Sequence, residues 1–157
     1  MALALSIIAL LATLYQLYLQ RLHNEKSLKP LLQIDVKDHN ELIYVRVQNN
    51  GLGPYIIEKL SFTKDEQLYT SIGSCISLNP KSYHNVSVSE TATKVILPNN
   101  YLDVFSVRLK PEDTDKYIEQ IKTELSLIRL KVHGRDIYDN QINIERDLNW
   151  FVKYSDL

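Results

Sequence analysis

The segment from Asn79 to Asn85 gathers residue types that bind phosphates and stack on bases. Within one polar stretch it holds a cation at Lys81, an aromatic ring at Tyr83, an imidazole at His84 and an amide at Asn85. Positive charge and hydrogen-bond donors suit phosphate oxygens, and an aromatic face suits a stacked adenine. The alternative interpretation is an ordinary polar loop without a ligand.

Two further positions offer the same chemistry. Asn100 lies in an Asn-Asn-Tyr run, and Arg108 is followed two residues later by Lys110. The candidate ligand-binding residues are therefore Lys81, Tyr83, His84, Asn85, Asn100 and Arg108. An oligomer would repeat this patch around its axis, which suits a cyclic, symmetric ligand.

The sequence offers little catalytic chemistry. The four histidines are scattered, residues 51–53 lack the third glycine of a dinucleotide motif, and no G-x-S-x-G or P-loop is present. Cys75 is the only cysteine, which excludes an internal disulfide and fits a reducing compartment. Asp113 and Asp115 are interpreted as partners of a helix dipole. We therefore expect no enzyme activity, no metal centre and no cofactor.

The overall charge argues against a general binder of duplex DNA or RNA. The chain has 18 Lys and Arg against 19 Asp and Glu, a net charge of −1, and the first 20 residues carry none of these charges. A duplex-binding protein usually has a clear basic excess. A local patch for a small anion stays possible.

The elements that would position these residues begin with an apolar helix. Residues 2–19 contain no charge, glycine or proline, and as a helix they would be about 27 Å long, most of a bilayer's hydrocarbon core. Small or polar residues recur through it at a 4-3-4-3-4 spacing, at Ala2, Ser6, Ala9, Thr13, Gln16 and Gln20. A 3.5-residue period and small side chains favour close helix packing. We expect a transmembrane helix that forms homo-oligomers through this face.

The flanks of the helix predict its orientation. A cleaved signal peptide is disfavoured, because no basic residue precedes the apolar run and bulky residues end it. Basic residues follow it at Arg21, His23, Lys26 and Lys29, and such residues stay cytoplasmic. We expect a single-pass protein of the inner membrane, N-out and C-in. Its parts are a transmembrane helix (1–20), a basic juxtamembrane linker (21–30) and a cytosolic β-rich sensor domain (31–157).

The remainder of the chain predicts a mainly-β domain. Apolar residues alternate over 32–36 and 43–47 around a polar turn at 38–41, which predicts a hairpin. The glycines and proline of 49–54 predict a turn, after which Ile56, Leu60 and Phe62 continue the sheet. Further strands are expected at 82–89, 101–109 and 128–132.

Later signals complete the fold class. Lys110-Pro111-Glu112-Asp113 is expected to open one inserted helix over about 112–124. A turn is expected at 133–136, with Ile137 on the returning strand. The sequence thus predicts a β-sandwich or small β-barrel with one inserted helix, behind one transmembrane helix.

One stretch resembles a known group of proteins. His23-Asn24, Ser27, Lys29-Pro30, Val47 to Pro54 and Ile56-Ile57 resemble small bacterial membrane proteins with an "NNGLGPA-I" signature, except that Tyr55 replaces the usual alanine. In these proteins N-terminal helices precede a β-rich cytosolic domain. Some small membrane proteins of this design resemble anti-phage effectors, including type III CRISPR effectors gated by cyclic oligoadenylate. We interpret the signature itself as structural, with glycines that permit positive φ and Asn side chains that can bond the turn backbone.

Three functions remain open. The first is an antiviral effector whose cytosolic domain binds a cyclic oligonucleotide and whose oligomeric helices then disrupt the membrane or open a pore. The second is a bitopic inner-membrane adaptor that tethers a partner protein without a ligand. The third is a peripheral enzyme that carries no recognisable motif. The expected partners under the first are the lipid bilayer, further copies of the chain and a cyclic oligonucleotide.

Overall fold

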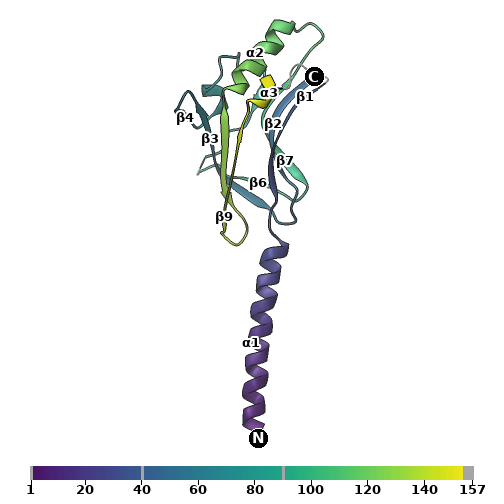
Figure 1. Ribbon diagram of the computed structural model, residues 1–157, viewed down its shortest axis with the longest axis vertical. Coiled ribbons are helices and arrows are strands. Elements are labelled where there is room, and N and C mark those ends of the chain that lie inside the picture. Colours follow the sequence, from purple (N-terminus) through teal and green to yellow (C-terminus); the bar gives the residue numbers. More distant parts are fainter. Residues whose placement is uncertain (1, 40, 90, 154–157) are drawn as a thin grey trace.

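A long N-terminal helix precedes a β-sandwich in the computed structural model, which describes residues 2–39, 41–89 and 91–153 (Figure 1). Helix α1 (Ala2–Ser27) projects from one end of the sandwich, and none of its residues is buried. It is long and apolar enough to cross a membrane. Residues 21–27 of the predicted linker are helical too. The predicted class, an N-terminal apolar helix before a mainly-β domain with an inserted helix, is confirmed.

Sheet A contains four antiparallel strands. Their order is β1 (Leu32–His39), β2 (Leu42–Asn49), β7 (Asn100–Arg108) and β5 (His84–Asn85). The pairing of β1 with β2, from Leu32 opposite Asn49 to His39 opposite Leu42, confirms the predicted hairpin. Residue 40 of the predicted turn lies outside the described residues.

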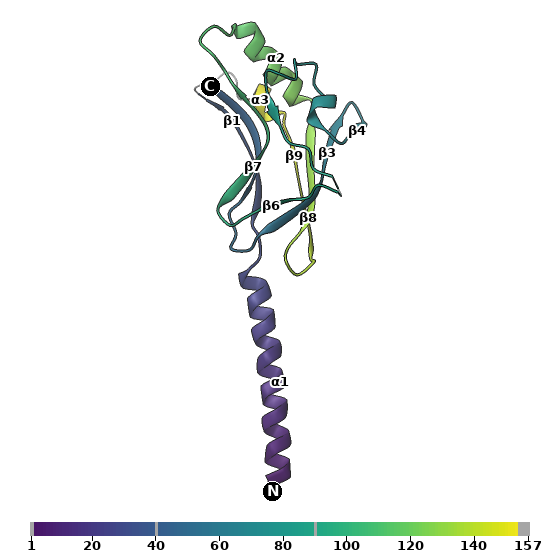
Figure 2. The same ribbon diagram turned by 180° about the vertical axis from the view of Figure 1, so that it is seen from behind.

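Sheet B packs against sheet A. Its main order is β4 (Gln67–Tyr69), β3 (Tyr55–Lys64), β8 (Arg129–Arg135) and β9 (Gln141–Asp147), and β6 (Lys94–Ile96) also pairs with β3. The expectation that β3 continues the first sheet is wrong. The turn at 50–54 carries the chain into the second sheet instead, where Tyr55, Ile57 and Phe62 become fully buried. Figure 2 shows the two sheets from behind.

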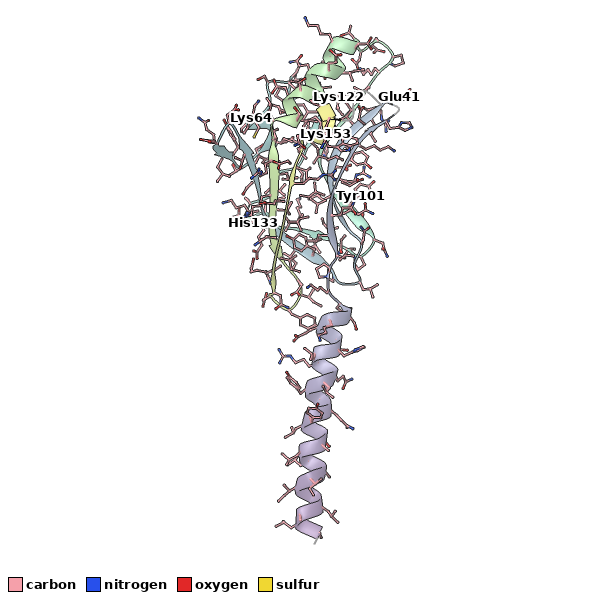
Figure 3. The ribbon with its side chains drawn as sticks, viewed as in Figure 1. Glu41, Lys64, Tyr101, Lys122, His133 and Lys153 are labelled. Carbon is pink, nitrogen blue, oxygen red and sulfur yellow. The ribbon has the colours of Figure 1, made fainter. Side chains whose placement is uncertain are left out.

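A helix closes the end of the sandwich away from α1. Helix α2 (Asp115–Ser126) buries Ile121 and Leu125 against the core, and α3 (Trp150–Lys153) packs beside it. The short 3-10 helix η1 (Ile72–Ser74) lies between β4 and β5 in the chain. Ion pairs of Lys122 with Asp38 at 2.5 Å and of Lys64 with Glu124 at 3.0 Å tie α2 to both sheets. Figure 3 labels Lys64 and Lys122, the lysines of these two ion pairs.

Some predicted boundaries are wrong for local reasons. Helix α2 begins after Thr114, whose hydroxyl accepts a hydrogen bond from the Tyr117 N–H at 3.3 Å, and not at 112. Strand β8 continues through His133 to Arg135, and the turn follows at 136–140, where the Asp136 carboxylate accepts the N–H groups of Tyr138 and Asn140. Residue 137 therefore lies in the turn. Of the strand expected at 82–89, only β5 forms.

The 49–54 turn holds the end of α1 against the sandwich. The buried Asn49 side chain accepts N–H groups of Leu31 and Gly51 and donates to the carbonyls of Gly53 and Ile96. A Cβ atom on Gly51 would overlap the Leu31 nitrogen, and one on Gly53 would overlap the Leu28 carbonyl group. The turn is therefore structural, and the expected hydrogen bonds from an Asn side chain to turn backbone are present at Asn49. The other expected reason, positive φ at the glycines, is wrong. None of the described glycines has positive φ, and close backbone approach is what requires them.

Candidate ligand-binding site

The outer face of sheet A carries a polar hollow of about 510 Å³. Side chains from β2, β5, β7 and the loop before β5 surround it. They are Leu42, Arg46, Lys81, Ser82, Tyr83, His84, Tyr101, Asp103, Ser106 and Arg108. Four of these ten are basic or imidazole side chains and one is acidic, so the hollow favours an anion.

A bulge in the sheet places the β7 residues on one face. The pairing of β2 with β7 shifts between Val45 and Arg46, so that Val45 lies opposite Phe105 and Arg46 opposite Asp103. The extra residue lets both Val104 and Phe105 enter the core. Tyr101 and Asp103 before the bulge, and Ser106 and Arg108 after it, therefore all line the outer hollow.

Arg46 is held on three sides at the floor of this site. Its guanidinium lies 3.6 Å from the centre of the Tyr44 ring and 3.9 Å from that of Tyr101. Its Nε donates to Asp103 at 2.9 Å. The Tyr44 hydroxyl donates to Asp35, and burial together with this carboxylate raises the pKa of Tyr44. The Arg46 guanidinium therefore holds the exposed Tyr101 ring in a fixed position on this face.

A tight turn presents the lysine of the site. The Asn79 side chain accepts the Lys81 N–H at 3.0 Å. The backbone carbonyl of Asn79 accepts both the N–H and the hydroxyl of Ser82. Asn and Pro in the first two positions are typical of such turns. Strand β5 follows and adds His84, which pairs with Ser106 on β7.

A second hollow of about 390 Å³ adjoins the first. Lys81, Ser82 and Arg108 line both hollows, and Lys110 and Asp113 line the second. Within the described residues, neither Lys81 nor Arg108 forms an ion pair, whereas Lys110 lies 3.9 Å from Glu112. Two uncompensated cations therefore stand where the hollows meet, a suitable arrangement for a phosphate.

The structure brings four of the six predicted ligand-binding residues together. Lys81, Tyr83, His84 and Arg108 line the first hollow, but Asn85 and Asn100 are not among its lining residues. Asn85 is half-buried in β5, and the Asn100 side chain accepts its neighbour's N–H at the start of β7.

The role of Tyr83 is partly structural. Its ring centre lies 5.2 Å from that of the buried Phe105, and burial raises the pKa of its hydroxyl. Sequence reasoning missed Arg46, Asp103 and Ser106, which lie far from the 79–85 segment in the chain. The alternation of the predicted second strand places positions 44 and 46 on its outer face, and this was the signal that could have indicated Arg46.

The predicted oligomer face of α1 has two kinds of polar group. The hydroxyls of Ser6 and Thr13 donate to the carbonyls of Ala2 and Ala9 at 3.0 and 2.9 Å, so they are satisfied within their own helix. The amides of Gln16 and Gln20 form no side-chain hydrogen bond with the described part of the chain.

Other reactive groups do not form a site among the described residues. No three His, Cys, Asp or Glu side chains there lie close enough to hold a metal ion. Cys75 is buried, and that burial raises the pKa of its thiol to about 11, so the unreactive thiol form dominates at neutral pH.

The comparisons with known proteins give little. No protein-family model and no curated protein matches the chain. Among solved structures, the archaellum periplasmic stator protein FlaG from Sulfolobus acidocaldarius is similar over 75% of this chain and 100% of that chain, with 11% identity and a TM-score of 0.30. A likeness of this size says nothing about function.

Proposed function

We propose that this protein is a membrane-anchored receptor without enzyme activity, whose β-sandwich binds an anionic, nucleotide-like ligand on the outer face of sheet A. The observation that carries the proposal is the pair Lys81 and Arg108, which stand without ion pairs to described residues where two hollows meet. Tyr101 is about half exposed and supplies a planar surface for a base, and the Arg46 guanidinium, 3.9 Å from the ring centre, holds that ring in place.

The finer proposal is an antiviral effector that responds to a cyclic oligonucleotide. Several copies would pack through the small and polar face of α1, and a symmetric ligand would contact the same hollow in each copy. Ligand binding would then change the packing of the helices, and the membrane would be disrupted or a pore would open. The basic residues that follow the apolar run favour a cytoplasmic sandwich, where such messengers occur.

Ligand-induced stabilisation tests the binding proposal. The full-length protein in detergent is heated with a panel of cyclic mono-, di- and oligonucleotides and their linear counterparts. At a hundredfold excess over Kd, binding adds about 2.7 kcal/mol to the free energy of unfolding. The variants Lys81→Ala and Arg108→Ala should lose this gain.

Lys131→Ala is the matched control, because Lys131 is an exposed lysine on sheet B. It should respond to ligand as the unmodified protein does. If no nucleotide raises the melting temperature, or if all three variants respond alike, this hollow is not a nucleotide site. The adaptor function would then be the better interpretation.

A further inference from the structure

The end of the sandwich that α1 enters exposes several large apolar side chains. Four separate segments contribute them: the linker after α1, the 49–54 turn, the β6–β7 turn and the β8–β9 turn. The side chains are Leu28, Leu31, Leu52, Leu97 and Ile137, which we call the apolar base. Leu31 and Leu52 are about two-thirds exposed, at 66% and 67%.

Backbone contacts join these segments at one end. The Asn50 N–H donates to the Leu31 carbonyl, and the Asn99 N–H donates to the Asn49 carbonyl at 2.9 Å, which ties the β6–β7 turn to the 49–54 turn. Ile56, which closely follows the 49–54 turn, pairs with Arg135 at the end of β8, and this pairing brings the β8–β9 turn to the same end. Both ribbon views show these turns at the end next to α1 (Figures 1 and 2).

Nothing in the fold requires leucines at these tips. Exposed apolar side chains elsewhere on the sandwich, such as Leu68 on β4 and Leu127 after α2, stand singly at other elements. A single exposed leucine is ordinary, whereas a cluster indicates a surface that contacts something apolar.

The length of α1 indicates what covers the apolar base. The uncharged part of α1 ends at Gln20 and its first charged side chain is Arg21, so the hydrocarbon core ends near Arg21. Ser27, the last residue of α1, then lies about 9 Å beyond the hydrocarbon, just outside a headgroup layer of about 5–8 Å. The base therefore faces the lipid headgroups directly.

We infer that the apolar base rests on the surface of the bilayer that α1 crosses, with its leucine and isoleucine side chains in the headgroup layer. This inference depends on the proposed membrane anchor. Charges at this end are mixed, because Lys29 and Arg135 stand beside Asp136 and Asp139. Apolar contact rather than attraction to anionic lipid is thus the expected cause of binding.

Tryptophan fluorescence in reconstituted full-length protein tests the inference. Leu52→Trp and Leu97→Trp place a probe at the apolar base, and Leu68→Trp and Leu127→Trp place a matched exposed probe elsewhere. The zwitterionic vesicles carry phosphatidylcholine with a nitroxide on the headgroup, which quenches nearby indoles. Both base probes should lose fluorescence beyond the background of Trp150, and both control probes should not.

A fifth variant separates this inference from the anchor. Leu10→Trp in vesicles of acyl-brominated phosphatidylcholine should be quenched if α1 spans the bilayer. Quenching of Leu10→Trp with base probes that behave like the controls would overturn the docking of the base and leave the anchor intact. An unquenched Leu10→Trp would overturn both. Base quenching that needs added anionic lipid would overturn the apolar mechanism.

Discussion

At the scale of single residues, Arg46 sets the geometry of the candidate site, because its guanidinium contacts the rings of Tyr44 and Tyr101 and the carboxylate of Asp103. Arg46 enters the site through strand pairing with β7, more than fifty residues away in the chain. The bulge that sets its opposite residue to Asp103 leaves only a faint trace in sequence, the adjacent apolar pair Val104 and Phe105.

Truncation of Tyr83 should reduce stability even without ligand. Tyr83→Ala removes the ring that packs on Phe105, and for a half-buried aromatic side chain we expect a loss of about 1–2 kcal/mol in the free energy of unfolding. Tyr83→Phe keeps the ring and should unfold near the unmodified midpoint. Denaturant unfolding of all three proteins measures this. Equal stability of Tyr83→Ala and the unmodified protein would show that the ring does not contribute to folding and is free to contact a ligand.

Protonation of His133 should make the domain less stable in mild acid. Burial, followed by the charges of Lys131 and Lys59, lowers the pKa of His133 below its ordinary 6.5, and a hydrogen bond with Asn143 only partly opposes this. The unfolded chain therefore binds the proton more readily than the folded one. Stability is full above about pH 6.5 and falls as the pH drops from there toward the folded pKa.

The variant His133→Asn removes this titration. Its unfolding midpoint, measured from about pH 5 to 8, should vary less with pH than that of the unmodified protein. His84→Asn is a suitable control, because His84 is exposed. An unchanged pH dependence in His133→Asn would contradict the assignment.

At the scale of elements, local patterns predicted strands well and turns poorly. Alternation identified β1, β2, β7 and β8, since each has one face against the core. The turn at 136–140 was misplaced because Gly134 suggested a turn. Gly134 instead lies in β8, where a Cβ atom would overlap the backbone of Ile56 on β3. Close approach of two backbones cannot be read from one sequence.

The same close approach makes Gly53 intolerant of a side chain. Gly53→Ala places a methyl group into the Leu28 carbonyl group, so the linker must shift. We expect a loss of about 1–3 kcal/mol by chemical denaturation, as for other overpacked sites. The adjacent Leu52→Ala should change stability by less than about 0.5 kcal/mol, because Leu52 is exposed. A Gly53→Ala protein as stable as Leu52→Ala would mean that the linker is not held by this turn.

The two glutamines of α1 should govern self-association in the membrane. Their amides bond to no other described side chain, and neighbouring copies offer partners. Each interhelical hydrogen bond contributes about 0.6–1.7 kcal/mol, roughly three- to twenty-fold in association. Gln16→Leu with Gln20→Leu should therefore weaken oligomers seen by cross-linking in vesicles. Leu11→Ile with Leu17→Ile, off the predicted face, should not, and similar losses from both pairs would contradict a specific face.

At the scale of the whole molecule, the order of parts was predictable and their assembly was not. Hydropathy and period separate α1 from the sandwich, because a membrane and a β-core demand different patterns. Nothing local indicated that the chain changes sheets at 50–54 or that α2 closes the end far from α1. Both features depend on which faces of the two sheets and of α2 bury the most apolar area when they pack together.

The orientation of the whole chain is testable in cells. A reporter fused after the C-terminus should be active only in the cytoplasm if the basic residues after the apolar run hold that side in. Replacing Arg21, Lys26 and Lys29 together with Gln should reduce this bias, whereas replacing Lys37, on β1, should not. Periplasmic activity of the unmodified fusion would overturn the orientation and, with it, any cytoplasmic ligand.

The fixed junction at the 49–54 turn also sets the rotation of the sandwich about the axis of α1. Helix α1 runs unbroken from its apolar part to Ser27, and Asn49 and Gly53 fix that end to the sandwich. The direction in which the hollow on sheet A points is thereby locked to the face on which Gln16 and Gln20 lie. One residue inserted near Lys26 would turn the sandwich by about 100° around the helix axis, whereas seven would return it to within about 20°. In an oligomer that forms through α1, every hollow would therefore face the same way relative to the oligomer axis. The number of residues between the helix face and the sandwich sets that direction.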